Sequence, residues 1–344
     1  SFKVTQLASA AVWKGTTDAS GPLSSQDISS QNPDASGLTL SAAPFAQAVT
    51  AGTFTVNGKQ ITIATTDTLK SVFDQISSVT GGAVTASYSS ASDKITLSSG
   101  STIVLGSGAD TSNFLQIAKL SNNDSGTVTS TAKLGSVQTK SVLNKANLAT
   151  TISDGGSGNG AFTINGVTIS FSATDDSLTK VIDRINSSSA GVVAAYDSVT
   201  NRLSLTNKAA GDVGISVQDT TGNFLAATGL AGGTLTRGNN LLYTVNDGPQ
   251  LTSRTNSITS DSSGISGLNV TALAKGTFSV AVAGDTAKIK TAITNFVNEY
   301  NKVQAQINTE TASSTNAPAT VTAGTLTGNQ NTAALDSRLR DLMN

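Results

Sequence analysis

The stretch DTAKIKTAITNFVNEYNKVQAQI, residues 285–307, has a spacing of apolar residues that decides how the rest of the chain is interpreted. These residues are separated alternately by four and by three positions, so they lie along one side of a helix. They are Ile289, Ile293, Phe296, Tyr300, Val303 and Ile307. Asp285 stands where this helix begins and can cap its free amides. The spacing therefore predicts a helix with an apolar seam that must be buried.

A second apolar stripe follows the loop that contains Pro318 and Gly324. Its members are Ala334, Leu335, Leu339, Leu342 and Met343. We expect the seam of the first helix to pack against Leu335 and Leu339, which makes residues 285–344 a coiled-coil-like helical leg. Because the stripe stops at Asn344 inside a helical pattern, we expect the sequence to be a fragment with a truncated leg.

The composition indicates several small, β-rich domains without a charged binding surface. A chain of 344 residues exceeds the usual size of a single core. Charged residues make up 12% of it and the net charge is −1, so no electrostatic footprint for nucleic acid or for an anionic membrane surface is present. Few aromatic residues and abundant Ser, Thr, Asn and Gly favour short strands joined by tight turns.

The chain lacks both cysteine and histidine. Disulfides, thiolate chemistry and the common catalytic constellations that use histidine are therefore excluded. No apolar run approaches the length of a membrane span, so we expect no membrane insertion. We expect no catalytic residue, no cofactor and no metal site.

Two stretches about a hundred residues apart share one order of patterns. In the first, Asn57 and Gly58 form a type I′ turn between two short apolar strands. A helix then begins near Thr66 and Asp67, and a second hairpin and the triplet Asn113-Phe114-Leu115 follow. The apolar positions are Phe54, Val56, Ile61 and Ile63 in the hairpin, Leu69, Val72, Phe73 and Ile76 in the helix, and Val84, Ala86, Tyr88, Ile95 and Leu97 in the second hairpin.

The second stretch repeats this order around the turn at Asn165 and Gly166. Its helix is expected to be capped by Asp175 and Asp176. The matching positions are Phe162, Ile164, Val167 and Ile169, then Leu178, Val181, Ile182 and Ile185, then Val193, Ala195, Tyr196, Leu203 and Leu205, and finally Asn223-Phe224-Leu225. The pattern predicts tandem ββαββ-type head modules at residues 37–138 and 139–238.

The remaining segments are expected to form a body domain. The N-terminal strand near Val4 should pair with a strand near Val280, because a module inserted into another must leave it and return at nearby points. We assign residues 1–36 and 239–284 to this body and residues 285–344 to the leg. The predicted fold class is multidomain α+β, with β-rich head modules and an α-helical leg.

Candidate chemical sites have simpler structural interpretations. The aspartates at helix starts are expected for capping, which is favoured over a carboxylate cluster. Asn246-Asp247-Gly248 lacks the alternating ligands of a calcium loop and is interpreted as a turn. Trp13, the only tryptophan, is expected to be a packing residue.

Four segments carry a resemblance to a known family. They are residues 2–8 (FKVTQLA), the two Phe-Thr-(Val/Ile)-Asn-Gly motifs, which look like the flagellin IN motif, residues 291–301 (TAITNFVNEYN) and residues 324–329 (GTLTGN). Together they resemble the bacterial flagellar filament cap family, also called hook-associated protein 2 or FliD. The family pattern has Asp at the position of Asn329, which is a mild departure.

The resemblance implies a secreted, non-enzymatic protein at the tip of the bacterial flagellum. It implies a homo-oligomeric ring that promotes flagellin folding and polymerisation and thereby motility. Its partners would be further copies of itself, flagellin, hook-filament junction proteins and, through termini absent here, an export chaperone.

Two alternatives remain open at this point. One is a surface-exposed adhesin, since polar β modules also suit cell adhesion and binding of a host surface ligand. The other is a different flagellar axial protein of the flagellin or hook-filament junction type. A heptad leg favours the cap over an adhesin, and no partner nucleic acid is expected.

Overall fold

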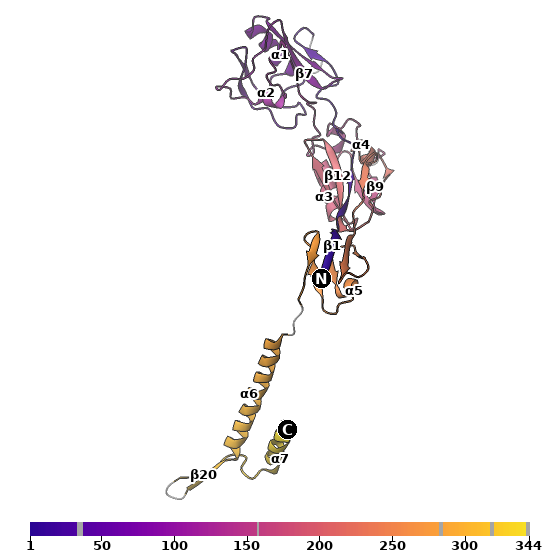
Figure 1. Ribbon diagram of the computed structural model, residues 1–344. Coiled ribbons are helices and arrows are strands. Elements are labelled where there is room, and N and C mark those ends of the chain that lie inside the picture. Colours follow the sequence, from indigo (N-terminus) through magenta and orange to yellow (C-terminus); the bar gives the residue numbers. More distant parts are fainter. Residues whose placement is uncertain (33–36, 157, 282–284, 317–319, 342–344) are drawn as a thin grey trace. The chain divides into compact units, whose positions relative to one another are not determined.

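The computed structural model describes residues 1–32, 37–156, 158–281, 285–316 and 320–341 (Figure 1). The chain divides into two compact units, Ser1–Phe278 and Ser279–Asn344. The first unit contains three hydrophobic cores, and its sheets are antiparallel throughout the described residues. The expected mixed class of helices and antiparallel sheets in several domains is therefore confirmed.

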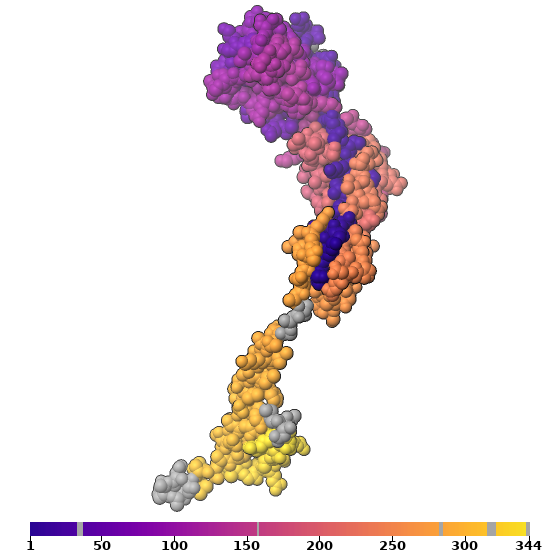
Figure 2. All heavy atoms as spheres, in the orientation of Figure 1, coloured from indigo at the N-terminus to yellow at the C-terminus, as the bar shows by residue number. Residues whose placement is uncertain are grey.

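The first core belongs to a body lobe, which joins the two ends of the first unit. Its main sheet has the order β16-β15-β1-β19. These strands are β1 (Phe2–Gln6), β15 (Leu241–Val245), β16 (Leu251–Ser253) and β19 (Gly276–Phe278). Phe2 pairs with Val245 on one side and with Phe278 on the other, so β1 is central. Figures 1 and 2 show these indigo N-terminal residues between orange segments.

A smaller hairpin completes the body lobe. It consists of β17 (Ser257–Thr259) and β18 (Asn269–Thr271), with the short helix α5 (Ser260–Ser263) after β17. The core is small, and its largest fully buried member is Tyr243. The strand that pairs with β1 ends at Phe278, slightly before the Val280 expected from sequence. Residues 282–284 of the expected body range lie outside the described residues.

Module 1 is the lobe whose core runs from Leu23 to Leu134. Its sheet has the order β3-β6-β7-β8, and the hairpin β4–β5 and the helix α1 precede β6. The bounds are β3 (Ile28–Ser29), β4 (Gly52–Val56), β5 (Lys59–Ile63), α1 (Leu69–Val79), β6 (Val84–Ser89), β7 (Lys94–Ser99), α2 (Phe114–Ile117) and β8 (Thr127–Thr129). Helix α1 buries the four residues whose spacing indicates one face, namely Leu69, Val72, Phe73 and Ile76.

Module 2 is the lobe whose core contains Ala11 and the buried residues from Val137 to Leu230. It has two sheets, with the orders β11-β12-β2-β14 and β10-β9-β13. The bounds are β2 (Ala10–Lys14), β9 (Gly160–Ile164), β10 (Val167–Phe171), α3 (Leu178–Ser187), β11 (Val192–Asp197), β12 (Arg202–Ala210), β13 (Val217–Thr221), α4 (Phe224–Ala227) and β14 (Thr234–Thr236). A short 3₁₀ helix, η1, spans Leu143–Lys145.

The assignment of residues 1–36 to the body alone is wrong. Strand β2 lies between β12 and β14 in the sheet of module 2, and Ala11 is fully buried there. Leu23 and Ile28 belong to the core of module 1. The N-terminal segment therefore contributes to all three lobes, because its partners are distant in sequence and leave no local signal at these positions.

The helix caps also differ from the expected aspartates and Thr66. Helix α1 is capped by Thr68, whose hydroxyl accepts the Ser71 amide at 3.1 Å. Helix α3 is capped by Ser177, whose hydroxyl accepts the Lys180 amide at 3.3 Å. Asp67 instead accepts the Ala64 amide, so the acidic residue tightens the turn before the helix.

The second unit contains α6 (Thr286–Thr311), the hairpin β20 (Ser313–Asn316) to β21 (Thr320–Ala323), and α7 (Gln330–Asp341). The Asp285 carboxylate accepts the Lys288 amide at 2.9 Å, so α6 begins at the cap that the sequence indicates. Leu342 and Met343 of the expected second stripe lie outside the described residues.

Candidate assembly surface

The seam of α6 is an exposed apolar stripe. Its exposed fractions are 59% at Ile289, 59% at Ile293 and 57% at Phe296. Tyr300 and Ile307 are partly buried, while Val303 remains exposed. The expectation that α7 buries this seam is therefore wrong for this chain by itself. The described part of α7 is short, and it cannot cover a helix of 26 residues.

One part of the seam does meet α7. Phe296, Tyr300 and Val303 line a cavity of about 230 Å³ together with Glu299 and Leu339. Leu335, the other residue expected there, is 49% exposed and does not line the cavity. The helical pair thus forms an open apolar groove that can accept further apolar side chains.

The polar contacts of the second unit contribute little to its stability. Lys302 pairs with Glu299 at 2.6 Å and Arg340 pairs with Asp336 at 3.0 Å, and both basic side chains are well exposed. Exposed pairs of this kind are worth about 0–1 kcal/mol. In addition, Gln304 Nε2 and Asp336 Oδ1 are buried without a hydrogen-bond partner in the described part of the chain.

The Asn-Gly turns of the two modules have matching geometry. Asn57 and Gly58 have φ angles of 50° and 72°, and Asn165 and Gly166 have 49° and 79°. Positive φ at both central residues is what a type I′ hairpin turn requires. These four residues are exposed or partly exposed and shape their hairpins.

Each motif asparagine also holds a third segment of its module. The Asn57 side chain accepts the Val104 amide at 2.7 Å, and its backbone amide donates to the Val104 carbonyl. Asn165 makes the same pair of bonds with Ser216, at 3.0 Å and 2.9 Å. Turn propensity explains only part of the motif, since the side chain serves as a clamp.

A second pair of asparagines, Asn113 and Asn223, has a structural role that the sequence pattern did not predict. Asn113 accepts the Thr50 amide and donates to the Ala48 carbonyl. Asn223 accepts the Ser153 amide and donates to the Thr151 carbonyl in the same way. The recurring Asn-Phe-Leu triplet was the signal, but its hydrogen-bond role needs long-range partners that the sequence does not reveal.

The aromatic cores of the modules correspond as well. Phe54 stacks on Phe114 with ring centroids 5.0 Å apart, and Phe162 stacks on Phe224 at 4.6 Å. All four rings are fully buried. The phenylalanine of each motif is thus joined to the phenylalanine of each triplet, and these stacks tie the hairpin to the end of the module.

The carboxylates have structural partners rather than catalytic ones. Asp176 forms an ion pair with Arg184 at 2.9 Å, and the hydrogen bonds from Arg184 lower the pKa of its carboxyl. The hydrogen bond from the Ala173 amide is the main reason why the pKa of the buried Asp154 is lowered. Burial raises the pKa of Tyr88, whose hydroxyl donates to Asp93 at 2.8 Å. The hydrogen bonds of these groups hold loops in place.

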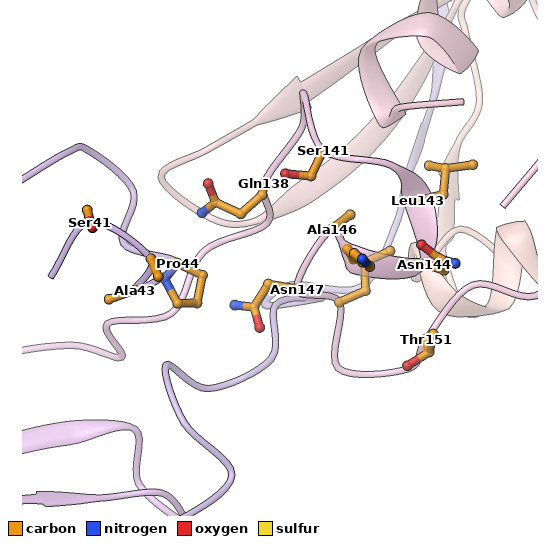
Figure 3. Close-up of a pocket in the computed structure, with 13 residues that line it drawn as sticks. Ser41, Ala43, Pro44, Gln138, Ser141, Leu143, Asn144, Ala146, Asn147 and Thr151 are labelled. Carbon is orange, nitrogen blue, oxygen red and sulfur yellow. The ribbon is translucent and has the colours of Figure 1, made fainter. Parts of the chain in front are cut away.

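A polar cavity of about 530 Å³ lies beside the connection between modules 1 and 2 (Figure 3). Ser41, Pro44, Gln138 and Asn147 are among its lining residues. The amide nitrogens of Gln138 and Asn147 are bound to backbone carbonyls, so they stabilise the connection itself. Among the described residues there is no group of acidic side chains that could hold a metal, and no helix is long and apolar enough to cross a membrane.

Comparisons with known proteins support the expected resemblance. Residues 238–344 match the family model "Flagellar hook-associated protein 2 C-terminus", and residues 151–209 match "Flagellin hook IN motif". A flagellar hook-associated protein 2 of Thermotoga maritima is 29% identical over 271 residues. That alignment covers 74% of this chain and 43% of the relative, so the chain spans less than half the length of this protein.

Two solved structures are also similar. The D1-D2-D3 domains of the flagellar cap protein FliD from Escherichia coli match with 21% identity and a TM-score of 0.36, over 60% of this chain and 64% of that one. The D2-D3 domains from Serratia marcescens match with 22% identity and a TM-score of 0.26, over 36% and 72%. Through residues 238–344 and its aligned relative, the chain is similar to proteins of the flagellar hook-associated protein 2 family.

Proposed function

We propose that the protein is a flagellar filament cap, a structural and non-catalytic component that assembles with copies of itself at the filament tip. The match of residues 238–344 to the C-terminal domain of hook-associated protein 2 carries this proposal. The exposed seam of α6 supports it, because a helix without a buried side chain needs further partners to be stable.

The seam is proposed to be one face of a coiled-coil leg. Ile289, Ile293 and Phe296 have the spacing of that architecture and are more than half exposed in the single chain. The unpaired buried atoms of Gln304 and Asp336 also indicate an incomplete helical pair. Segments of the longer protein would cover this seam, as less than half of the aligned relative is represented here.

The head is proposed to contain tandem repeats of the ββαββ type. Both modules have hairpin, helix and hairpin in the same order, with corresponding asparagine clamps and phenylalanine stacks. We retain the ranges 37–138 and 139–238 as approximate bounds, with residues 10–14 added to the second module and residues 23–29 to the first. The body would then be residues 1–9 and 239–284.

The cap would promote flagellin polymerisation by geometry. In the part of the chain described, we find no catalytic constellation, and the charge is nearly balanced. Its partners would be copies of itself, flagellin and the hook-filament junction, outside the cell at the flagellum. The adhesin alternative has no supporting observation of its own.

Complementation of cells that lack their cap protein tests the proposal. The full-length protein should restore filaments, whereas Ile293→Asp in the same protein should leave flagellin monomers in the medium. Ala305→Asp is the matched control, because it places the same charge on α6 at an exposed position outside the seam. Failure of the unaltered protein, or equal loss with both variants, would contradict the proposed leg.

A further inference from the structure

Modules 1 and 2 differ at one edge of their sheets. In module 1 the outer side of β6 pairs with the short strand β3, with Ile28 opposite Tyr88 and Ser29 opposite Ser87. In module 2 the corresponding strand is β11, and no described strand pairs with its outer side. The outer edge of β11 is therefore free to pair with another strand.

The difference arises from the length of one connection. The Leu23 amide donates to the Asp93 side chain at 2.9 Å, and the Val137 amide donates to the corresponding Asn201 at 3.3 Å. Further along the chain, Thr39 forms a β-bridge with the residue that caps α1, and Val142 forms the corresponding bridge with the residue that caps α3. The connection from Leu23 to Thr39 in module 1 is thus longer than that from Val137 to Val142 in module 2. The extra residues of module 1 include β3, so module 2 lacks the covering segment.

The missing segment leaves apolar surface in module 2. Phe73 and Tyr88, which β3 and its neighbours cover in module 1, are 0% and 1% exposed. The equivalent residues Ile182 and Tyr196 are only partly buried. Ile182 and Tyr196 therefore keep exposed apolar surface that an added apolar side chain, like Ile28 in module 1, could bury.

On the outer edge of β11, the backbone groups of Ala194 are occupied and those of Tyr196 are free within the described part of the chain. Asn186 accepts the Ala194 amide at 2.6 Å and donates to the Ala194 carbonyl at 3.2 Å, so it blocks the edge there. Because the backbone N–H and C=O groups point to alternate sides along a strand, those of Tyr196 point to the same outer side as those of Ala194. Among the described residues, no side chain forms a hydrogen bond with the backbone N–H or C=O of Tyr196, and its hydroxyl donates to Asn201.

Module 1 also indicates which charge a segment bound to β11 should carry. In module 1 the Asp27 carboxylate accepts both the backbone amide and the hydroxyl of Ser90, at 2.6 Å and 2.8 Å. Ser198 holds the equivalent position in module 2, and neither donor has a partner within the described residues. An acidic residue directly before the apolar one would satisfy both donors.

We propose that the edge of β11 at Tyr196 is an acceptor site for an extended segment of a partner protein. The segment would carry an acidic residue followed by an aliphatic residue, as Asp27 and Ile28 do in module 1. It would add to the sheet by backbone pairing, place its carboxylate on Ser198 and insert its apolar side chain between Ile182 and Tyr196. This site is separate from the α6 seam and does not depend on the proposed leg.

The test uses a peptide with the sequence of residues 24–32, SSQDISSQN, as the probe. A diazirine-bearing leucine replaces the isoleucine, and cross-links to the intact chain are mapped by mass spectrometry. We expect saturable cross-links on α3 near Ile182 and on β11 near Tyr196. An unlabelled peptide should compete, and a competitor with Ile28→Asp should be at least about tenfold weaker, since it cannot bury the apolar side chain.

Matched chain variants locate the binding. Ile182→Asn should reduce the cross-link yield severalfold, whereas Val193→Asn, at a position that is 45% exposed on the other face of β11, should leave it unchanged. The fluorescence of Trp13 checks that module 2 remains folded. Cross-links scattered over the surface, cross-links confined to Phe73 and Tyr88 of module 1, or equal competition by the Ile28→Asp peptide would each overturn the proposal.

Discussion

Replacement of Phe162 by alanine should strongly and locally destabilise module 2. The ring is fully buried and packs on Phe224, with centroids 4.6 Å apart and planes within 6°. It also contacts the ring of Phe171, with centroids 6.1 Å apart. The substitution removes both ring contacts and leaves a cavity at the centre of the core, because the hairpin, β13 and α4 meet there.

The size of the loss follows from burial. A fully buried Phe→Ala change costs about 3–5 kcal/mol, and the two aromatic contacts favour the upper part of this range. Phe296→Ala is the matched control, because that ring is 57% exposed and lies in the other unit. Full burial of such a side chain is worth about 1.5–3 kcal/mol, so partial burial predicts a cost of about 1 kcal/mol in the second unit.

Trp13 provides the assay. It is the only tryptophan, it packs against the core of module 2, and its indole donates to the Leu230 carbonyl at 2.8 Å. Denaturant titration followed by tryptophan fluorescence therefore reports the unfolding of this module. A loss of less than about 1 kcal/mol in the free energy of unfolding for Phe162→Ala, or an equal shift of the Trp13 transition by Phe296→Ala, would contradict this role of the Phe162 ring.

Three further predictions concern the turns, the acid response and the assembly. Gly58→Ala and Gly166→Ala should each cost about 1–2 kcal/mol through positive φ alone, since an added Cβ meets nothing within 4 Å, and hydrogen exchange should loosen only the module that carries the change. Equal loosening of both modules would contradict their independence. The lowered pKa of Asp176 means that its ion pair stabilises the fold fully above about pH 4 and is lost as the pH falls through the folded value. Trp13 fluorescence should thus show a steeper acid loss for the unaltered chain than for Asp176→Asn, and parallel losses would argue against a stabilising role for the pair. In solution, copies of this chain should associate weakly, with a mass that depends on concentration and salt; a tight oligomer insensitive to both would disprove modest, partly polar contacts.

Local patterns allowed much of the head to be predicted. The hairpin at Asn57 and Gly58 and the buried face of α1 follow from turn chemistry and helical spacing within a few residues. The second hairpin of module 2 was less clear, because residues 192–195 are all apolar and alternation does not define a face. The structure buries Val192 and Ala194, whereas the sequence pattern had selected Val193 and Ala195.

Long-range pairing and missing partners account for the remaining errors. Nothing near Ala11 indicates that β2 inserts between β12 and β14. The seam of α6 was identified by spacing, yet most of it is exposed, because the described part of α7 meets only some of its residues. The caps at Thr68 and Ser177 were missed because several adjacent residues could serve, and only the observed backbone selects one.

The central position of β1 has a consequence for the order of folding. Its neighbours β15 and β19 lie more than two hundred residues further along the chain, as the pairs Phe2–Val245 and Phe2–Phe278 show. Closing so large a loop is entropically costly, and contacts of this separation form late. The pairings of module 1 are much nearer in sequence, as Ile28–Tyr88 shows, so this module can condense while the body sheet and the β2 pairings of module 2 are still open. The body lobe should therefore be the last to close during folding and, with its small core, the first to open under denaturing stress.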